Sequence, residues 1–154
     1  MVIKNTKILL VEDNRDHLEM IQMVLSNEKL VNTIYSVTNG EEALDYLFRH
    51  GAYADKAQSP RPSLILLDIK LPRISGLEVL RQIKSDARLK SIPVVLLTTS
   101  TEKNEIIQGY EYGANSYVIK PLRFEELMYR VETIYNYWTM TNQLPVIENN
   151  GYPG

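Results

Sequence analysis

The chain has 154 residues, 44% hydrophobic and 23% charged, which suits one compact domain. It has no cysteine, which excludes disulfides, thiolate nucleophiles and cysteine-ligated zinc or iron–sulfur centres. The net charge of −2 leaves no basic footprint, so we expect no nucleic-acid partner. No aliphatic run approaches the roughly 20 residues of a membrane span, and the start lacks a signal peptide's apolar segment. We expect a cytoplasmic protein with no membrane partner.

Five short aliphatic or β-branched runs alternate with longer amphipathic stretches. Four of the five runs are continuously apolar or nearly so, which is typical of strands buried on both faces of a parallel sheet. The predicted strands are 7–11, 33–37, 64–67, 94–97 and 116–119.

A helical pattern with apolar residues three and four positions apart follows each predicted strand. Asn14 and Asn39 are suited to cap the first two helices, and Gly113 is suited to end the fourth. The predicted helices are 14–28, 39–50, 75–86, 102–112 and 123–138. Five βα units in succession predict a doubly wound α/β fold. Two segments fall outside this pattern, a loop at 51–62 and a partly disordered tail at 139–154.

Polar side chains follow four of the five predicted strands. These residues are Glu12 and Asp13 after the first, Asp68 after the third, Thr98, Thr99 and Ser100 after the fourth, and Lys120 after the fifth. Ligands of open α/β sheets lie outside the carboxyl ends of the strands, so we expect these side chains to meet at one edge.

Three carboxylates at one point need a counter-charge. Two unit charges about 4 Å apart repel by roughly 4 kcal/mol at an effective dielectric near 20. Lys120 supplies one positive charge, and a hard divalent cation such as Mg²⁺ suits the oxygen donors. A cation, an ammonium and a hydroxyl together form a receptor for a phosphoryl group, with Asp68 placed as the nucleophile.

These features resemble the receiver domains of two-component response regulators, the CheY-like superfamily, over residues 5–138. The motifs are VED at 11–13, the aliphatic run that ends at Asp68, LP at 71–72, Gly76, LLTTS at 96–100 and YVIKP at 117–121. The resemblance implies a flavodoxin-like sheet of five parallel strands in the order 2-1-3-4-5 with five helices. It also implies a single-domain regulator with no output domain.

The resemblance also implies a role for each motif residue. Asp68 is then the phosphoacceptor, Asp13 a direct ligand of Mg²⁺ or Mn²⁺, and Glu12 a ligand acting mostly through water. The main-chain carbonyl of Lys70 is the third protein ligand, and Lys120 pairs with the phosphoryl oxygens.

The remaining implied roles concern the switch. Thr98 moves toward the phosphate and Tyr117 rotates inward with it, while Thr98, Thr99, Lys120 and Lys70 contact the phosphate. The bond before Pro121 is expected to be cis. A sensor histidine kinase is the implied phosphoryl donor. The surface around the fourth helix, fifth strand and fifth helix is the implied output.

Four residues depart from the family pattern. Glu12 stands where Asp is commoner, and its extra methylene is compatible with a ligand that acts through water. Lys70 stands at a variable position that tunes dephosphorylation, so it leaves the lifetime of the phosphate open. Ser75 replaces a common Asp but remains a suitable N-cap. Thr99 is bulkier than the usual small residue, which narrows access to Asp68.

A narrower resemblance links the chain to regulators of phytochrome-type photoreceptor kinases. It rests on the loop at 51–62, on SPRPSLILLD and IKSDARLKSIPVVLLTTS, and on the tail with YW and QLP. Loops of this kind also occur in other bacterial receivers.

The aromatic residues near the C-terminus allow two interpretations. They are Tyr110, Tyr112, Tyr117, Tyr129, Tyr135, Tyr137 and Trp138. They either cover the last two helices or form a self-association face, and we favour a homodimer through this face. We expect His17 and His50 to face solvent.

Four other functions were weighed. A phosphohydrolase of the haloacid-dehalogenase type needs a second Asp two positions after its nucleophile, where this chain has Lys70. A flavodoxin-like cofactor binder needs a phosphate-cradling loop after the first strand, where this chain has EDNRD. The complete residue set argues against a silent receiver. Transfer of the phosphoryl group onward to a histidine phosphotransfer protein stays open.

Overall fold

The computed structural model describes residues 6–26 and 32–146. Five parallel strands form one sheet in the order β2-β1-β3-β4-β5. They are β1 (Thr6–Val11), β2 (Asn32–Val37), β3 (Leu64–Leu67), β4 (Val94–Thr98) and β5 (Ser116–Ile119). The predicted strand order is therefore confirmed, and every strand boundary lies within one residue of its prediction.

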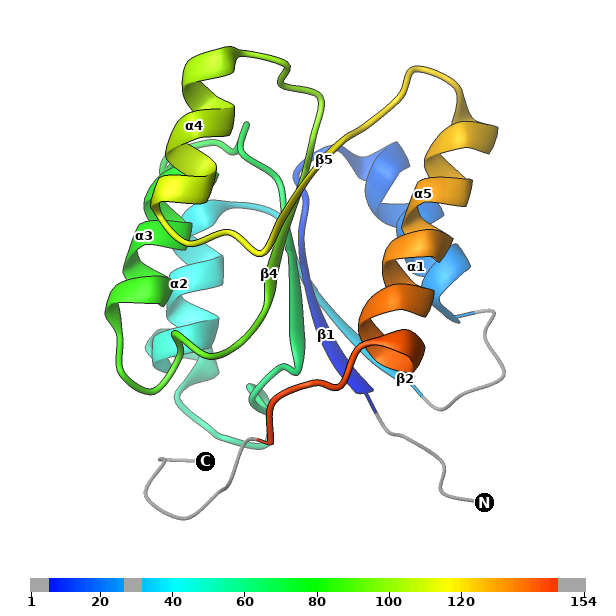
Figure 1. Cartoon of the computed structure of the whole chain (residues 1–154). Coiled ribbons are helices and arrows are strands. Elements are labelled where there is room, and N and C mark those ends of the chain that lie inside the picture. The colour runs from blue at the N-terminus through cyan, green and yellow to red at the C-terminus, as the bar shows by residue number, and fades with distance from the viewer. Residues whose placement is uncertain (1–5, 27–31, 147–154) are drawn as a thin grey trace.

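Helices cover both faces of the sheet. Figure 1 shows α1 and α5 on one face and α2, α3 and α4 on the other. The helices are α1 (Arg15–Ser26), α2 (Gly40–Phe48), α3 (Gly76–Ser85), α4 (Lys103–Glu111) and α5 (Phe124–Asn136), with short turns η1 (Gly51–Tyr53) and η2 (Tyr137–Thr141). The doubly wound prediction is confirmed. Residues 27 and 28 of the predicted first helix lie outside the described residues.

Local signals fix where the helices begin and end. The Asn14 side chain accepts a hydrogen bond from the main-chain N–H of His17 at 3.1 Å, and the Asn39 side chain accepts one from Glu42 at 2.8 Å. Both are N-cap bonds that satisfy free N–H groups of a first turn. After α4 the chain turns at Gly113, whose φ of 101° suits glycine.

Alternate residues of the central strands pack into two hydrophobic cores, one under each layer of helices. Leu9 and Val11 of β1 lie in the core under α2 and α3, whereas Ile8 and Leu10 lie in the core under α1 and α5. All four residues of β3 are at most 1% exposed. Burial of each such side chain contributes about 1.5–3 kcal/mol, so the sheet is a rigid base for the loops at its edges.

The segment at 51–62 is a fixed loop rather than a free one. The buried Tyr46 of α2 donates its hydroxyl to the carbonyl of Pro60 at 2.7 Å. Arg61 donates to the carbonyl of Leu47 at 2.7 Å, and Ser59 is buried. The loop therefore packs against the C-terminal half of α2.

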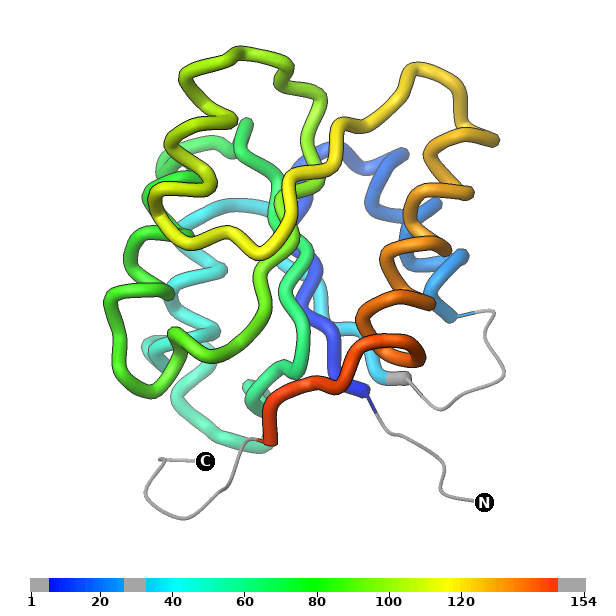
Figure 2. Tube along the Cα trace, viewed as in Figure 1, coloured from blue at the N-terminus to red at the C-terminus, as the bar shows by residue number. Residues whose placement is uncertain are grey.

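The tail prediction needs a correction at its start. Residues 137–141 continue α5 as the π-helical turn η2, and Thr139 is fully buried with its hydroxyl bonded to the carbonyl of Tyr135. The sequence pattern ended at Trp138 because the π turn shifts the helical period. Figure 2 shows residues 142–146 passing below the sheet, away from the carboxyl ends of its strands. Residues 147–154 lie outside the described part of the chain.

Within the described ranges, no helix combines the length and the apolar character needed to cross a membrane.

Candidate functional site

The loops that follow β1, β3, β4 and β5 gather at one edge of the sheet, the upper edge in Figures 1 and 2. The strands are parallel, so their carboxyl ends lie together there. The order β1-β3-β4 places the ends of the first and third strands side by side at the centre of the sheet. This is the edge at which the sequence placed its polar residues.

Three carboxylates meet at this edge, as predicted. Glu12 and Asp13 come from the end of β1 and Asp68 from the end of β3, and the three groups offer oxygens that all lie within 4.8 Å of one another. Glu12 and Asp68 are buried, while Asp13 is exposed. Two buried acids and one exposed acid thus form an acidic cluster that reaches solvent through Asp13.

Lys120 bridges the two buried acids. Its Nζ lies 2.5 Å from Oε1 of Glu12 and 2.8 Å from Oδ2 of Asp68. The lysine side chain is only 1% exposed, so water screens these ion pairs little. One ammonium against three carboxylates leaves an excess of negative charge, which a further cation would offset.

Burial changes the acidity of the deeper carboxyl. Burial, opposed by the Lys120 ammonium and aided by the nearby Asp68 carboxylate, raises the pKa of Glu12 to about 7. Near neutral pH the site is therefore poised between binding a proton and binding a cation.

The donor set fits Mg²⁺ or Mn²⁺. It consists of carboxylate oxygens, the ligands that hard divalent cations prefer. The main-chain N–H of Lys70 donates to Oδ1 of Asp68 at 3.2 Å, which helps to fix the orientation of this carboxylate. The residues present thus suit the predicted metal, with Glu12, Asp13 and Asp68 as the groups that would hold it.

The Lys70 side chain turns away from the acids. Its Nζ lies 3.2 Å from the carboxylate of Glu105 in α4. The hydrogen bond and the charge of Glu105 raise the pKa of Lys70. Glu105 also accepts a short hydrogen bond from the hydroxyl of Ser100. The sequence did not indicate this link between the loop after Asp68 and α4, since 35 residues separate its partners.

The predicted switch residues differ in their surroundings. Thr98 is fully buried, and its hydroxyl accepts from the main-chain N–H of Ser100 at 3.3 Å, whereas Thr99 is exposed. Tyr117 is half-buried and donates its hydroxyl to the carbonyl of Ser100 at 2.9 Å. Tyr117 is thus hydrogen-bonded to the loop that follows Thr98.

The expectation of a cis bond before Pro121 is not met. No cis peptide bond occurs among the described residues, and Lys120 reaches both carboxylates through a trans bond. The trans form is the favoured one by about 0.5–1 kcal/mol for bonds that precede proline.

The prediction for His17 is wrong. Its Nδ1 lies 3.2 Å from Nζ of Lys120, and the ring is partly buried. Burial and the Lys120 ammonium lower the pKa of His17. Its position in the first turn after β1, at the same edge as Asp13, was the signal that could have revealed it. His50 is exposed, as expected, but lies just beyond α2 and stacks on Phe48.

The aromatic residues near the C-terminus differ in exposure, and the self-association face stays a prediction. Tyr135 is buried, and Tyr117, Tyr112 and Trp138 pack partly against the core. Three tyrosines are at least half exposed, namely Tyr110 at 53%, Tyr129 at 71% and Tyr137 at 50%.

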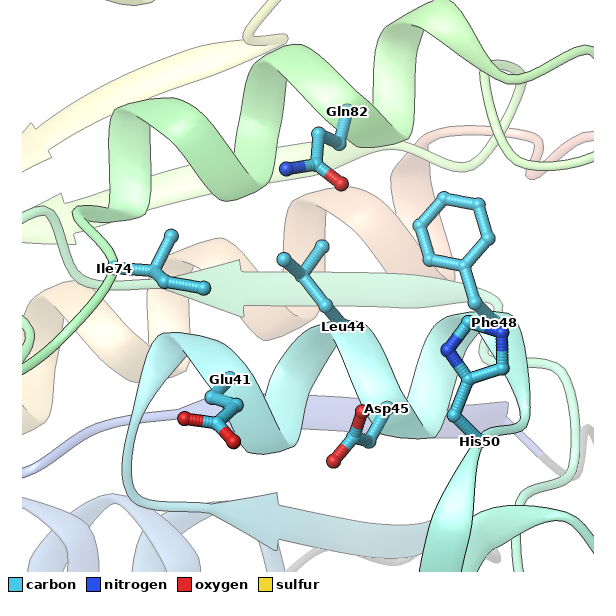
Figure 3. Close-up of a pocket in the computed structure, with 7 residues that line it drawn as sticks. All are labelled: Glu41, Leu44, Asp45, Phe48, His50, Ile74 and Gln82. Carbon is cyan, nitrogen blue, oxygen red and sulfur yellow. The ribbon is translucent and has the colours of Figure 1, made fainter.

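Two surface grooves contain none of the predicted site residues and are lined by residues outside the acidic cluster. The first, about 360 Å³, separates α2 from α3 (Figure 3) and is lined by Glu41, Leu44, Asp45, Phe48, His50, Ile74 and Gln82. The second, about 480 Å³, is lined from α1 and α5 by Asp16, Glu19, Met20, Met23, Phe124 and Met128.

A parallel α/β sheet with three acids and a lysine at the ends of its first, third and fifth strands defines the receiver class. The response regulator receiver domain model matches residues 8–132, and the chain belongs to this family. Receiver domains are signalling switches that histidine kinases phosphorylate. The predicted family is confirmed, and neither the phosphohydrolase nor the cofactor-binding alternative is favoured.

Individual relatives narrow the resemblance. The chain is 43% identical to the probable methanogenesis regulatory protein FilR2 of Methanothrix harundinacea over 138 residues, 90% of this chain and 86% of that protein. It is 39% identical to response regulator Rcp1 of Synechocystis sp. over 138 residues, 90% of this chain and 92% of Rcp1.

Solved structures show the same likeness. The phosphorylated cyanobacterial phytochrome response regulator RcpA superimposes with a TM-score of 0.89 at 40% identity, over 93% of this chain and all of RcpA. The Mn²⁺-bound form of Rcp1 superimposes with a TM-score of 0.86 at 38% identity, over 92% of this chain and 99% of Rcp1. The metal in Rcp1 agrees with the donor set found here.

Proposed function

We propose that Asp68 is the phosphoacceptor and that Glu12, Asp13 and Lys120 assist transfer to it. The observation that carries this proposal is the convergence of the three carboxylates within 4.8 Å, with Asp68 held at 2.8 Å from the Lys120 ammonium. The acids at 12, 13 and 68, with the Lys70 carbonyl, form the metal site. A bound Mg²⁺ would offset negative charge on the transferring group.

The chemical step is a transfer between a nitrogen and an oxygen. An Asp68 carboxylate oxygen forms the new bond to phosphorus as the bond from phosphorus to the imidazole nitrogen of the donor breaks. The electron pair of the broken bond stays on that nitrogen. Lys120 stabilises charge on the phosphoryl oxygens, and Thr98, Thr99 and Lys70 supply further polar contacts to the product.

Acetyl phosphate with Mg²⁺ tests this assignment. The wild-type protein should gain the mass of one phosphoryl group, and Asp68→Asn should gain none. Asp45→Asn, which changes an acid in the α2–α3 groove, is the matched control and should be phosphorylated like the wild type. Phosphorylation that persists in Asp68→Asn would contradict the assignment.

The proposed output is a change of self-association through α4, β5 and α5. β5 is an edge strand whose four residues are all half-exposed. Exposed apolar side chains flank it, including Ile107 at 43% and Tyr110 at 53% on α4 and Tyr129 at 71% on α5. Tyr117 of β5 is bonded to the loop after Thr98, so a shift of that loop on phosphorylation reaches this surface.

Sedimentation of the unphosphorylated and phosphorylated protein tests the dimer. Tyr129→Glu should abolish the dimer, because it places a charge in the apolar surface. Met23→Glu, on the far side of α5 from this surface, is the control for an added charge and should still form dimers. Equal association of the wild type and Tyr129→Glu would exclude this surface.

The proposed donor is a phytochrome-type histidine kinase in the cytoplasm. The likeness of this chain to RcpA, a cyanobacterial phytochrome response regulator, supports that pairing. Purified phytochrome kinase should phosphorylate the chain faster than a kinase without a photoreceptor. Faster phosphorylation by the kinase without a photoreceptor would refute the pairing with a phytochrome kinase, but it would not affect the assignment of Asp68 as the phosphoacceptor.

No described feature favours onward transfer to a histidine phosphotransfer protein, so the proposal is limited to the switch.

A further inference from the structure

The Lys120 ammonium has a third neighbour besides the two acids. Nδ1 of His17 lies 3.2 Å from Nζ, alongside Oε1 of Glu12 at 2.5 Å and Oδ2 of Asp68 at 2.8 Å. A lysine ammonium carries three N–H donors and accepts no hydrogen bond. Three acceptors on three donors leave the ammonium fully bonded and fixed in position.

This arrangement settles the chemistry of the histidine. Because the ammonium only donates, Nδ1 of His17 is the acceptor in the contact. The ring is then neutral, with its hydrogen on Nε2. His17 thus differs from the other two partners of Lys120, which are carboxylates.

The helix start holds His17 in place. Its main-chain N–H donates to the side chain of Asn14 at 3.1 Å, and the main-chain N–H of Asn14 donates to Oε2 of Glu12 at 3.1 Å. Glu12, Asn14, His17 and Lys120 thus form a closed ring of contacts. The ring joins the start of α1 to the end of β5.

We propose that His17 is a positioning residue for phosphotransfer to Asp68, which holds the Lys120 ammonium at the site through a neutral acceptor. This inference rests on the proposed function. A carboxylate at this position would compete with the incoming phosphoryl oxygens for the ammonium and repel them. A neutral imidazole orients the ammonium without doing so. Lys120 therefore stays beside Asp68 when its bond to Glu12 is exchanged for one to phosphate.

Three substitutions at one position test the proposal. His17→Leu removes the acceptor, His17→Asn retains a neutral acceptor near the place of Nδ1, and His17→Asp introduces an anion. The readout is the initial rate of Asp68 phosphorylation by acetyl phosphate at saturating Mg²⁺. The rate should fall about tenfold or more in His17→Leu, the equivalent of one lost hydrogen bond to a charged group. His17→Asn should retain the rate to within about twofold, and His17→Asp should be the slowest.

Controls separate positioning from folding. His50→Leu changes the other, exposed histidine and should keep the wild-type rate. Nitrogen NMR of the wild type should show a neutral His17 with hydrogen on Nε2, a signal that Lys120→Met should alter. A wild-type rate in His17→Leu, or equal loss in His17→Leu and His17→Asn, would overturn the proposal. Absence of phosphorylation in the wild type would instead refute the proposed function itself.

Discussion

Removal of the Lys120 ammonium, as in Lys120→Met, should destabilise the protein in a manner that depends on pH. Burial raises the pKa of Glu12 to about 7, so the folded wild type holds a proton that the unfolded chain releases above about 4.5. Wild-type stability therefore falls as pH rises from about 4.5 to 7 and then levels off. Without the ammonium, the pKa of Glu12 rises further, and the fall continues above 7.

The size of the effect follows from the site. Two carboxylate oxygens within 4.8 Å of each other repel by about 3.5 kcal/mol or more at an effective dielectric near 20. At about pH 6 Glu12 carries a proton, so the variant loses mainly the bond between Lys120 and Asp68, which we expect to cost about 1–3 kcal/mol. At about pH 8 the uncompensated pair should raise the cost to roughly 3–5 kcal/mol.

Urea unfolding followed by far-ultraviolet circular dichroism measures these differences. Added Mg²⁺ should recover part of the loss at the higher pH, because it binds the folded state and supplies the missing positive charge. Lys103→Met, at the exposed start of α4, is the control and should change stability by less than about 0.5 kcal/mol. The same cost of Lys120→Met at both pH values would refute this reasoning.

Three further predictions concern the metal, the packing of the loop after Asp68 and the packing of the loop at 51–62. Mn²⁺ affinity, measured by electron paramagnetic resonance, should weaken by up to about tenfold per pH unit below 7, because the proton on Glu12 competes with the ion. Gly76→Ala should cost about 3 kcal/mol in urea unfolding, because its Cβ would lie 2.0 Å from the carbonyl oxygen of Asp68. Tyr46→Phe should cost about 1–2 kcal/mol, because the buried hydroxyl donates to the carbonyl of Pro60.

The first two of these predictions have a result that would refute them, and the third has a matched control. An Mn²⁺ affinity that does not change with pH would show that Glu12 takes no part in the metal site. A wild-type unfolding midpoint for Gly76→Ala would show that the loop after Asp68 yields easily. For Tyr46→Phe the matched control is Tyr129→Phe, whose ring is 71% exposed and whose stability should stay unchanged.

The sequence was sufficient for the parts of the fold that depend on local pattern. The apolar run at 64–67 is a buried strand, and Asn14 and Asn39 cap their helices through bonds that span three residues. The convergence of Glu12, Asp13 and Asp68 was also predictable, because the carboxyl ends of parallel strands meet at one edge.

The sequence pattern could not predict contacts between segments that lie far apart in the chain. Lys120 and His17 are 103 residues apart, and the packing of α1 against the end of β5 decides that they touch. The pairing of Lys70 with Glu105 likewise depends on how far α4 approaches the loop after β3. The π turn at 137–141 has no distinct sequence signal, so the continuation of the helix to Thr139 and the burial of this residue were not predicted.

The late position of Lys120 in the chain has a consequence for biosynthesis. A ribosome completes β1 and β3 long before it reaches β5, so a nascent chain carries the acids at 12 and 68 without their ammonium. Those carboxylates stay hydrated or protonated until the last strand emerges. Docking of β5 at the sheet edge then supplies the charge that lets both acids leave water. Shortened products that stop before residue 120 should therefore remain open at this edge and be exposed to proteolysis.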